Sequence, residues 1–457
     1  MRRQRMSAST AGLLAVGLVL GGLAADDPER ATATAAASAT QPGERLTQTV
    51  ASEPDVAGRG RAADPVSPQR GARRTADPRP EQVGLQETVD AAVGYTGKRV
   101  QRFHFPGADY VKVRFSRLAV LPGDEVTVSD PDGVEVHSYR ADPRVLKVPG
   151  DSPTTRDESG GIWAMSVAGD TAVVTLRSKA ESLTERGGEL AGRAGDVVGD
   201  LSSYGVEIDR VARGFTPGEG SRGDDQPAGP GSEESVCGRD DKKDAVCYKS
   251  DHPAEFDNSH PVARLLIDGQ SLCTAWRIGP NNRLLTNNHC LNRTFQARDT
   301  EVWFNYQCTA CGDRRVKRPT KVVGADVLAT ERRLDYTLFT VRDFDAIRDF
   351  GHLTLDNRKA QRGEEVYIPQ HPGGSPKKIA MESDRDSRGA CRIDSPAYDG
   401  NFSGSDASYY CDTEAGSSGS PVLSRRTHKV IALHHFGGCP NSGVRSDLLH
   451  EQIADQL

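Results

Sequence analysis

Apolar and polar residues alternate along several short stretches between residues 85 and 180. Alternation at every second position is typical of a strand with one face in a core and the other in solvent. The pattern occurs in Val111–Phe115 and Trp163–Val167, and further strand-like runs are Val126–Val128, Val134–Tyr139 and Ala172–Leu176. The turn-forming run Ser129–Gly133 is typical of a hairpin. Five or more short strands joined by turns predict a small β-sandwich.

The patterns that follow are weaker. Glu181–Leu201 has a helical periodicity broken by glycines, and Val206–Val211 is typical of a further strand. Near the C-terminus, apolar residues recur at helical spacing after Ser446 and Asp447, either of which can cap a helix. These apolar residues are Leu448, Leu449, Ile453 and Leu457. We predict a β-rich domain over residues 85–215 and a C-terminal helix.

The first residues have the pattern of a secretion signal. Met1–Arg5 is basic, and Ala11–Leu23 is an apolar core too short to span a bilayer. Small residues end this core, so we expect cleavage near Ala24 and a signal peptide over residues 1–25. Because no later apolar run is long enough for a membrane span, the sequence predicts a secreted, extracellular protein that has no membrane anchor once the signal is removed.

Two further segments are poor in apolar residues. Residues 26–84 are rich in Ala, Thr, Pro, Arg and Asp, with almost no aromatic side chains. They cannot bury enough apolar surface to offset chain entropy, so we predict that they are disordered. Residues 216–235 are mostly small or charged, which predicts a linker that proteases can reach. We expect maturation to cut within residues 216–236.

Charge and cysteine usage exclude several kinds of site. The net charge of −6 gives no reason to invoke nucleic acid. All nine cysteines lie at or after Cys237, which predicts one oxidised domain over residues 236–457. Cys308 and Cys311 form a Cys-x-x-Cys, but no second pair stands at zinc spacing. We therefore predict no metal site and no cofactor.

The stretch with the clearest chemical signal is the turn Gly416–Ser420, between the strand-like runs Ala407–Tyr410 and Pro421–Leu423. Such a turn exposes Oγ of Ser418 and lets the N–H groups of Gly416 and Ser418 converge on one point. Acyl transfer needs a nucleophile and donors aimed at the oxygen that becomes negative. Taken alone, the motif is also compatible with an ordinary flexible turn.

Two upstream motifs favour the catalytic interpretation. His289 stands in a polar turn after an apolar run, and histidine is the usual general base for a serine. Asp335 begins a strand-like run, where a buried acid would hold the imidazole in the tautomer that accepts the serine proton. The order His289, Asp335, Ser418 is that of the double-barrel serine proteases.

From about Cys237 to Leu457, the chain resembles the chymotrypsin-like (trypsin-like) serine endopeptidases, and within them the bacterial lysyl and glutamyl endopeptidase branch. Gly416–Pro421 resembles the family's Gly-Asp-Ser-Gly-Gly-Pro, and Ser271–Ala275 resembles the strand before the histidine. Further similar segments are Val302–Cys308, Val366–Gly374 and Val430–Gly438. The resemblance implies an all-β fold of two antiparallel six-stranded barrels with the site between them. It also implies that the β-sandwich-like domain is a prodomain, while the sequence of that domain is also compatible with a surface- or carbohydrate-binding module.

Some positions depart from the family pattern. Asn287 and Asn288 replace small residues before the histidine, which could alter the hydrogen bonding behind the imidazole. Residue 417 is Ser and not Asp, so a zymogen switch in which a new N-terminus pairs with that Asp does not operate here. We expect activation by relief of steric cover.

The resemblance also bears on the disulfides. Cys273 is expected to pair with Cys290 across the histidine loop. The other expected pairs are Cys237 with Cys439, Cys247 with Cys308, and Cys391 with Cys411, which leaves Cys311 unpaired.

Four residues are candidates for the pocket that selects the P1 residue. Asp412 stands where, in the trypsin-type pattern, an acid selects Lys or Arg. Asp447 lies in the region from which lysyl endopeptidases draw their selecting Asp, although its position favours a helix cap over this role. His435, or His434 if the alignment slips by one, stands where a histidine of glutamyl endopeptidases binds a P1 carboxylate. We favour a basic P1 residue over an acidic one.

The sequence therefore predicts a secreted serine endopeptidase, made as a zymogen, that acts as a monomer on proteins and peptides and whose other partner is its own prodomain. Ser418 would attack, His289 would transfer the proton, Asp335 would orient the imidazole, and the N–H groups of Gly416 and Ser418 would hold the oxyanion. The alternatives are a glutamyl-specific enzyme of the same fold, a catalytically idle binding protein, and an esterase. The last usually carries Gly-x-Ser-x-Gly in an α/β sheet, whereas Ser420 stands in place of the second Gly.

Overall fold

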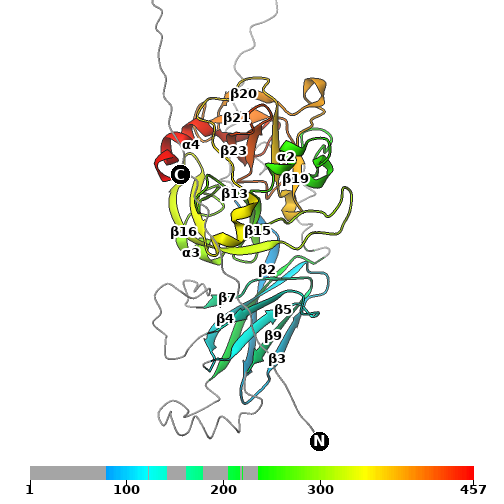
Figure 1. Cartoon of the computed structure of the whole chain (residues 1–457), viewed down its shortest axis with the longest axis vertical. Helices are drawn as coiled ribbons and strands as arrows, with labels where there is room; N and C mark the ends of the chain where they lie inside the picture. The colour runs from blue at the N-terminus through cyan, green and yellow to red at the C-terminus, as the bar shows by residue number, and fades with distance from the viewer. Residues whose placement is uncertain (1–78, 122, 141–160, 179–203, 217–218, 220–234) are drawn as a thin grey trace, which may run out of the picture. The chain divides into compact units, whose positions relative to one another are not determined.

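The computed structural model describes residues 79–121, 123–140, 161–178, 204–216, 219 and 235–457 (Figure 1). These residues form four β-sheets and three short α-helices, and the predicted mostly-β fold is confirmed. The expected signal peptide, the helical pattern at 181–201, nearly all of segment 26–84 and most of the linker lie outside the described residues. No described helix is long and apolar enough to cross a membrane.

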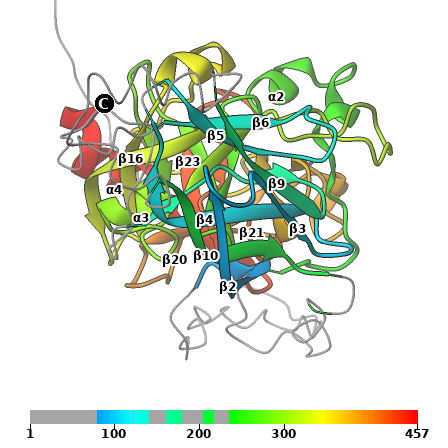
Figure 2. The same ribbon diagram turned by 90° about the horizontal axis from the view of Figure 1, so that it is seen from below.

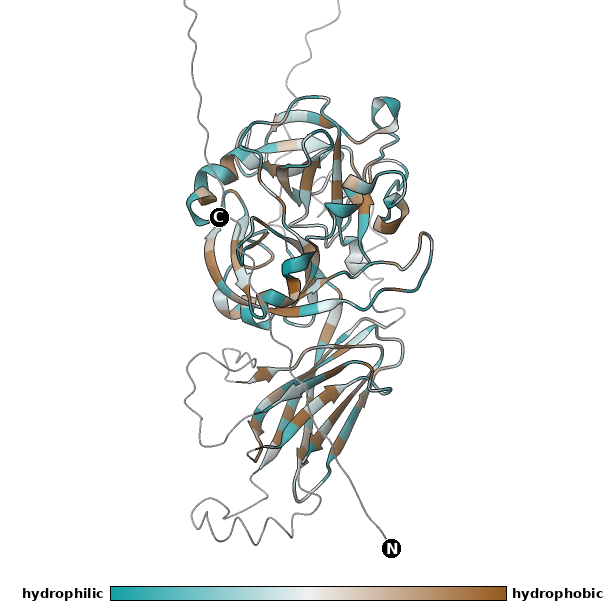
Figure 3. Ribbon diagram, viewed as in Figure 1, coloured by the Kyte–Doolittle hydropathy of each residue, from teal (hydrophilic) through white to brown (hydrophobic). Residues whose placement is uncertain are grey.

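Two sheets, called here the N-terminal sheets, lie within residues 84–214 (Figure 2). The first contains β2 (Gly84–Gly94), β10 (Gly205–Gly214), β4 (Tyr110–Ala119), β7 (Ile162–Trp163) and β8 (Val167–Ala168). The second contains, in spatial order, β3 (Val100–His104), β9 (Thr171–Arg177), β5 (Glu125–Ser129) and β6 (Val136–Tyr139). Apolar residues alternate along these strands (Figure 3), and those of both sheets, such as Val113 and Val174, form one buried cluster.

Two expectations for this region are corrected by the structure. Trp163–Val167, predicted as one strand, contributes to the separate strands β7 and β8, because Ser166 donates hydrogen bonds to Glu301 of another sheet. Residues 81–84, predicted to be disordered, form β1 (Glu81–Gln82) and the start of β2. Their backbone pairs with β13 (Ser271–Arg277), a partner so far along the chain that local composition does not reveal it.

The third sheet closes into a six-stranded barrel. Its order is β13-β12-β15-β16-β17-β14, and β14 pairs back onto β13. The strands besides β13 are β12 (Val262–Ile267), β14 (Leu284–Thr286), β15 (Glu301–Phe304), β16 (Thr320–Glu331) and β17 (Tyr336–Val341). One edge of β13 is shared: β14 pairs with Trp276 and Arg277, whereas β1 pairs with Ser271 and Leu272.

Both faces are buried along most of the barrel strands, whereas β16 alternates between partly buried and exposed residues over much of its length. Ala263, Leu265 and Ile267 alternate along β12 and contribute to the cluster that fills the barrel. Trp276 and Leu285 belong to a second cluster, which they share with residues of the eight-stranded sheet. This double burial fixes the register of the strands that carry the site loops, because a slip by one residue would exchange the two faces.

The eight-stranded sheet completes the described fold. In spatial order, its strands are β11 (Lys243–Asp244), β19 (Lys378–Ala380), β18 (Val366–Gln370), β22 (Pro421–Ser424), β23 (Val430–Phe436), β24 (Asn441–Arg445), β21 (Asp406–Tyr409) and β20 (Ile393–Tyr398). The helices are α2 (Pro253–Asp257), α3 (Thr294–Asp299) and α4 (Ser446–Ile453). Leu449 and Ile453 of α4 are buried in the second cluster.

Three disulfides join cysteines within residues 235–457. They link Cys237 to Cys439, Cys247 to Cys311, and Cys273 to Cys290. The expected pairing of Cys247 with Cys308 is wrong, because Cys311 lies at a Cα–Cα distance of 4.7 Å from Cys247, whereas Cys308 is buried in a β-bridge with Val316. Cys391 and Cys411, which were expected to pair, are neighbouring buried thiols that interact without a bond.

This pairing can be tested with two serine variants. A disulfide that closes a loop of this length contributes about 4 kcal/mol by chain-entropy arguments. We expect Cys311→Ser to lower the free energy of unfolding by roughly that amount, and Cys308→Ser to preserve a Cys247–Cys311 linked peptide in a non-reducing digest read by mass spectrometry. A Cys247–Cys308 linked peptide from the wild-type protein would contradict the structure.

Candidate active site

Three polar side chains from separate loops meet near the end of β14 and the start of β17. Thr286 pairs with Thr337, so the antiparallel register places the residues after β14 beside those before β17. Nδ1 of His289 lies 2.8 Å from Oδ2 of Asp335, and Nε2 of His289 lies 2.9 Å from Oγ of Ser418. The structure therefore brings together the three residues of the predicted triad.

The backbone at Asp335 is held in an uncommon conformation. Its φ of 46° lies in the left-handed region, which a residue other than glycine seldom adopts without support. The buried side-chain amide of Asn287 donates to the carbonyl of Asp335 at 2.8 Å, and the N–H of His289 donates to Oδ1 of Asp335 at 2.9 Å. Asn287, one of the departures from the family pattern, thus supports the turn behind the imidazole.

A second histidine contacts the same carboxylate from β23. Nδ1 of His435 lies 3.1 Å from Oδ2 of Asp335, and Nε2 of His435 lies 2.8 Å from Oδ2 of Asp406. Asp406 also accepts hydrogen bonds from the hydroxyls of Ser405 and Ser442. Sequence reasoning assigned His435 to the P1 pocket, but both of its ring nitrogens are engaged by carboxylates behind His289.

Asp406 was missed altogether. The available signal was weak: like Asp335, Asp406 is an acid placed directly before a strand-like apolar run. Nothing in that local pattern identifies His435 as its partner, since the two residues come together only when β24 brings β21 and β23 into one sheet.

The charges of this network reinforce one another. Burial alone would raise the pKa of Asp335, but the charges and hydrogen bonds of His289 and His435 hold it well below its ordinary value. Burial alone would lower the pKa of His435, but Asp406 and Asp335 raise it to about 9. At neutral pH, Asp335 is therefore a carboxylate and His435 an imidazolium. An ionised Asp335 favours the His289 tautomer that leaves Nε2 free to accept a proton from Ser418.

The loop before Ser418 forms a tight turn. The N–H of Ser417 donates to the carbonyl of Glu414 at 2.9 Å, and Gly416 has a φ of 95°, as the third residue of a type II turn requires. The carbonyl of Ala415 accepts a hydrogen bond from Gly373 at 2.7 Å. Because the C=O and N–H of a trans peptide point in opposite directions, this bond turns the N–H of Gly416 away from Gly373.

Glycine is required at position 416 for a second reason. A Cβ there would lie 2.5 Å from Cδ1 of Leu272 and 3.0 Å from the carbonyl oxygen of His371. The side chain of Leu272 on β13 therefore packs directly against the turn that presents the Gly416 N–H. This contact connects the barrel edge to the site.

A buried glutamine anchors the same turn. Ser417 donates its hydroxyl hydrogen to Oε1 of Gln370, and Nε2 of Gln370 donates to the carbonyl of Asp412 at 2.9 Å. Gln370 is fully buried at the end of β18. It therefore links both ends of the segment Asp412–Ser417, which precedes Ser418.

The other P1 candidates are also engaged within the protein. The carboxylate of Asp412 accepts hydrogen bonds from the N–H groups of Cys237 and Asp241, each at 2.8 Å. Asp447 forms a two-point ion pair with Arg445. His434 is buried, with Nδ1 2.7 Å from the hydroxyl of Tyr409. All four candidates are thus engaged in intramolecular contacts. The contacts of Asp412 hold the segment from Cys237 to Asp241, at the start of the disulfide-bonded part of the chain.

One group among the described residues has metal-like spacing. The potential ligand atoms of Cys273, His289 and Cys290 all lie within 4.8 Å of one another. Cys273 and Cys290 share a disulfide, so neither can supply the thiolate that binds zinc. The group instead ties the His289 loop to β13.

Comparison with known proteins places the chain among proteases. A family model described as Trypsin-like peptidase domain matches residues 273–433. A protein of Plasmopara viticola named Secreted RxLR effector protein 73 is 33% identical over 350 residues, which cover 74% of this chain and 77% of that protein. An uncharacterized protein of Sinorhizobium fredii, y4fB, is 34% identical over 181 residues, covering 37% of this chain and 26% of that protein.

Solved structures of proteases also align with the chain. A Glu endopeptidase is 18% identical with a TM-score of 0.35, covering 48% of this chain and 97% of the other. The inactive form of the protease Rv3671c, from M. tuberculosis, is 17% identical with a TM-score of 0.32, covering 46% and 94%. The family assignment rests on the family model and on the relative from Plasmopara viticola, and not on these structures.

The pKa of His435 leads to a prediction about stability. Because folding raises this pKa from about 6.5 to about 9, the stabilisation is fully present below pH 6.5 and is lost as the pH rises through about 9. We expect His435→Gln to lower the free energy of unfolding by about 3 kcal/mol at pH 6, and the deficit to shrink by pH 9.5.

Urea denaturation followed by tryptophan fluorescence at both pH values measures this deficit. His352→Gln is the control, because His352 is exposed and should show little effect at either pH. A deficit for His435→Gln that is the same at pH 6 and pH 9.5 would contradict the charged state assigned to His435.

Proposed function

The chain belongs to the trypsin-like serine peptidases, and we propose from this membership that it is a secreted endopeptidase that cuts peptide bonds through an acyl-enzyme on Ser418. That the protein is a serine endopeptidase follows from the family. The acyl-enzyme mechanism on Ser418 is supported by the line of hydrogen bonds from Oγ of Ser418 through His289 to Asp335.

In the first half-reaction, Oγ of Ser418 attacks the scissile carbonyl carbon while Nε2 of His289 takes the hydroxyl proton. The carbonyl π pair moves to oxygen, and the tetrahedral intermediate collapses as His289 returns the proton to the leaving amine. Water then attacks the acyl carbon while His289 takes one of its protons, and His289 returns that proton to Oγ of Ser418 as the ester bond breaks and the acid leaves. Asp335 stays ionised and stabilises the imidazolium in both halves.

The developing oxyanion is held by the N–H groups of Gly416 and Ser418, each lowering the barrier by roughly 3 kcal/mol. The bond from Gly373 to the carbonyl of Ala415 supports this role, because it orients the peptide before substrate arrives. Gln370 and Ser417 take the place of the new N-terminus and the Asp of animal digestive enzymes. Formation of this turn therefore does not depend on cleavage of the chain.

Behind the triad, His435 and Asp406 are positioning residues. An imidazolium between two buried carboxylates compensates their burial, which would otherwise favour protonation of Asp335. Neither side chain contacts the reacting atoms, since His289 stands between Asp335 and Ser418.

The remaining parts follow the family plan. The eight-stranded sheet supplies the second barrel, α4 is the C-terminal helix, and the N-terminal sheets are the prodomain of a monomeric zymogen. Secretion is supported by the N-terminal signal pattern, by the three disulfides and by the name of one relative.

Maturation cuts before Ser235. The N–H of Ser235 donates to Oδ1 of Asn441, and the next residues are tied by Asp412 and by the disulfide of Cys237. The cut therefore falls in residues 220–234, within the predicted linker. The P1 residue is basic or acidic, and a peptide library read by mass spectrometry separates these two alternatives.

The nucleophile is tested by Ser418→Ala. Loss of a serine nucleophile typically lowers kcat by about 10⁶-fold, so we expect the variant to make no detectable cuts in a mixed peptide library. Ser387→Ala is the control, because Ser387 is exposed in a separate loop. Equal cutting by Ser418→Ala and the wild type would exclude the proposed mechanism. No cutting by either protein after residues 1–234 have been removed would favour the binding-protein alternative.

The Gln370 anchor is tested by a double-mutant cycle with Ser417. A buried hydrogen bond of this kind contributes about 1–3 kcal/mol, so we expect Gln370→Ala to lower kcat by roughly 10- to 100-fold with little change in KM. Because Gln370 acts partly through Ser417, the variant Gln370→Ala/Ser417→Ala should lose less than the sum of the single effects. Additive losses, or a change confined to KM, would contradict this role.

A further inference from the structure

Strand β1 pairs with a stretch of the β13 edge that β14 does not cover. Glu81 lies opposite Leu272 and Gln82 opposite Ser271 in antiparallel register. The N–H groups of Val83 and Gly84 donate to the carbonyl of Gln270 at 2.8 and 3.1 Å. Residues 81–84 thus add a strand to the barrel edge in the manner of a bound extended peptide.

This edge lies beside the reacting groups. Leu272 packs against the turn of Gly416, and Sγ of the next residue, Cys273, lies within 4.8 Å of a ring nitrogen of His289. Since His289 must protonate the leaving amine, the part of a substrate that follows the scissile bond leaves past His289. The first backbone edge that it meets is that of Ser271 and Leu272.

A cleft of about 720 Å³ is lined by residues of both β1 and the oxyanion turn. Its lining includes Glu81, Gln82 and Val83 as well as Glu414 and Ala415 of the oxyanion turn. The strand β1 therefore borders the space through which the leaving side of a substrate would pass.

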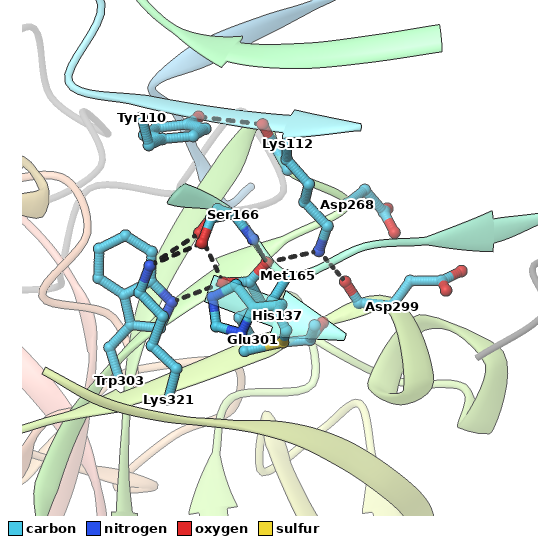
Figure 4. A network of polar contacts seen from close by, with 12 residues as sticks. Tyr110, Lys112, His137, Met165, Ser166, Asp268, Asp299, Glu301, Trp303 and Lys321 are labelled. Carbon is cyan, nitrogen blue, oxygen red and sulfur yellow. Dashed lines mark hydrogen bonds and ion pairs between the residues drawn. The ribbon is translucent and has the colours of Figure 1, made fainter. Parts of the chain in front are cut away.

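The N-terminal sheets hold β1 there through a buried ionic network (Figure 4). Glu301 of the barrel pairs with Lys112 at 2.9 Å and accepts hydrogen bonds from the N–H and hydroxyl of Ser166 at 2.8 and 2.7 Å. Lys321 of the barrel pairs with Glu135 at 2.7 Å. Lys112 and Lys321 lower the pKa of Glu301 to about 2 against the opposing effect of burial.

An apolar contact accompanies these charges. Tyr110 of the N-terminal sheets packs with Leu266 and Trp303 of the barrel, and Val83 covers this cluster. The hydroxyl of Tyr110 donates to the carbonyl of Gly269 at 3.0 Å. A surface that combines buried ion pairs with an apolar centre holds its partner without a covalent link.

We propose that the N-terminal sheets and β1 form a docked inhibitor that blocks the leaving side of the substrate cleft while the triad and the oxyanion turn stay fully formed. This inference rests on the proposed function. Cutting the linker alone does not release the block, because the network holds the inhibitor in place. A substrate with no residues beyond the scissile bond avoids the block, whereas a peptide that continues past it competes with residues 81–84.

The test uses the full-length chain and two substrates with the same residues up to the scissile bond, taken from the library profile. One ends in p-nitroaniline, and the other continues for several residues to a fluorescence quencher. Val83→Pro removes one of the two N–H donors to the carbonyl of Gln270, and Lys112→Ala removes the ion-pair partner of Glu301. Arg117→Ala is the control, because Arg117 pairs with Glu207 inside the N-terminal sheets at an exposed position.

We expect Val83→Pro and Lys112→Ala each to raise the ratio of peptide to anilide kcat/KM by at least about tenfold over wild type, because they weaken a competitor for the leaving side alone. Arg117→Ala should leave the ratio unchanged. Mass spectrometry verifies that residues 79–215 are present in each preparation.

The outcomes separate the inference from the proposed function. A ratio that neither variant changes, or parallel gains with both substrates, would overturn the leaving-side block while the enzyme remains a serine protease. Anilide hydrolysis that persists in Ser418→Ala would instead contradict the proposed function. A second measurement uses chains with a protease site engineered into residues 220–234. After cutting, the chain that is otherwise wild type should keep its N-terminal part bound to the protease part in size-exclusion chromatography. The chain that also carries Lys112→Ala should lose the N-terminal part.

Discussion

The buried carboxylate of Asp335 is the group on which the rest of the site depends. A carboxylate in this position is stable only if other groups compensate its charge, and here Nδ1 of His289 and Nδ1 of His435 both contact its Oδ2. Its left-handed backbone, supported by Asn287, sets the direction of the side chain. The sheet that carries His435 and Asp406 is thereby coupled to the barrel that carries His289.

The sequence predicted the mostly-β fold, the protease family and the three motifs that meet in the site, because each depends on a short stretch of chain. It did not predict the extension through His435 to Asp406, which requires knowing that β21, β24 and β23 are neighbours. The same reason explains the error at Cys247, where Cys308 and Cys311 are equivalent in local pattern and only the loop geometry favours Cys311. Asp412 was assigned to the pocket from its spacing to Ser418, whereas its carboxylate binds the backbone at Cys237 and Asp241.

One edge of β13 connects the fold to its regulation. A closed barrel has no open edge, but β14 covers only the end of β13, so Ser271 and Leu272 need another partner. In this chain the partner comes from residues that composition alone assigns to a disordered segment. Strand β1 and a substrate peptide bound on the leaving side therefore compete for the same backbone groups of Ser271 and Leu272.

The central claim is that Ser418 is a nucleophile activated by His289, and covalent labelling tests it most directly. The purified protein would be treated with a fluorophosphonate, which phosphonylates activated serines, and the adduct located by peptide mapping. The account predicts a single adduct on Ser418 that is lost in His289→Ala. An adduct on another residue, or none in a preparation that cleaves peptides, would contradict it.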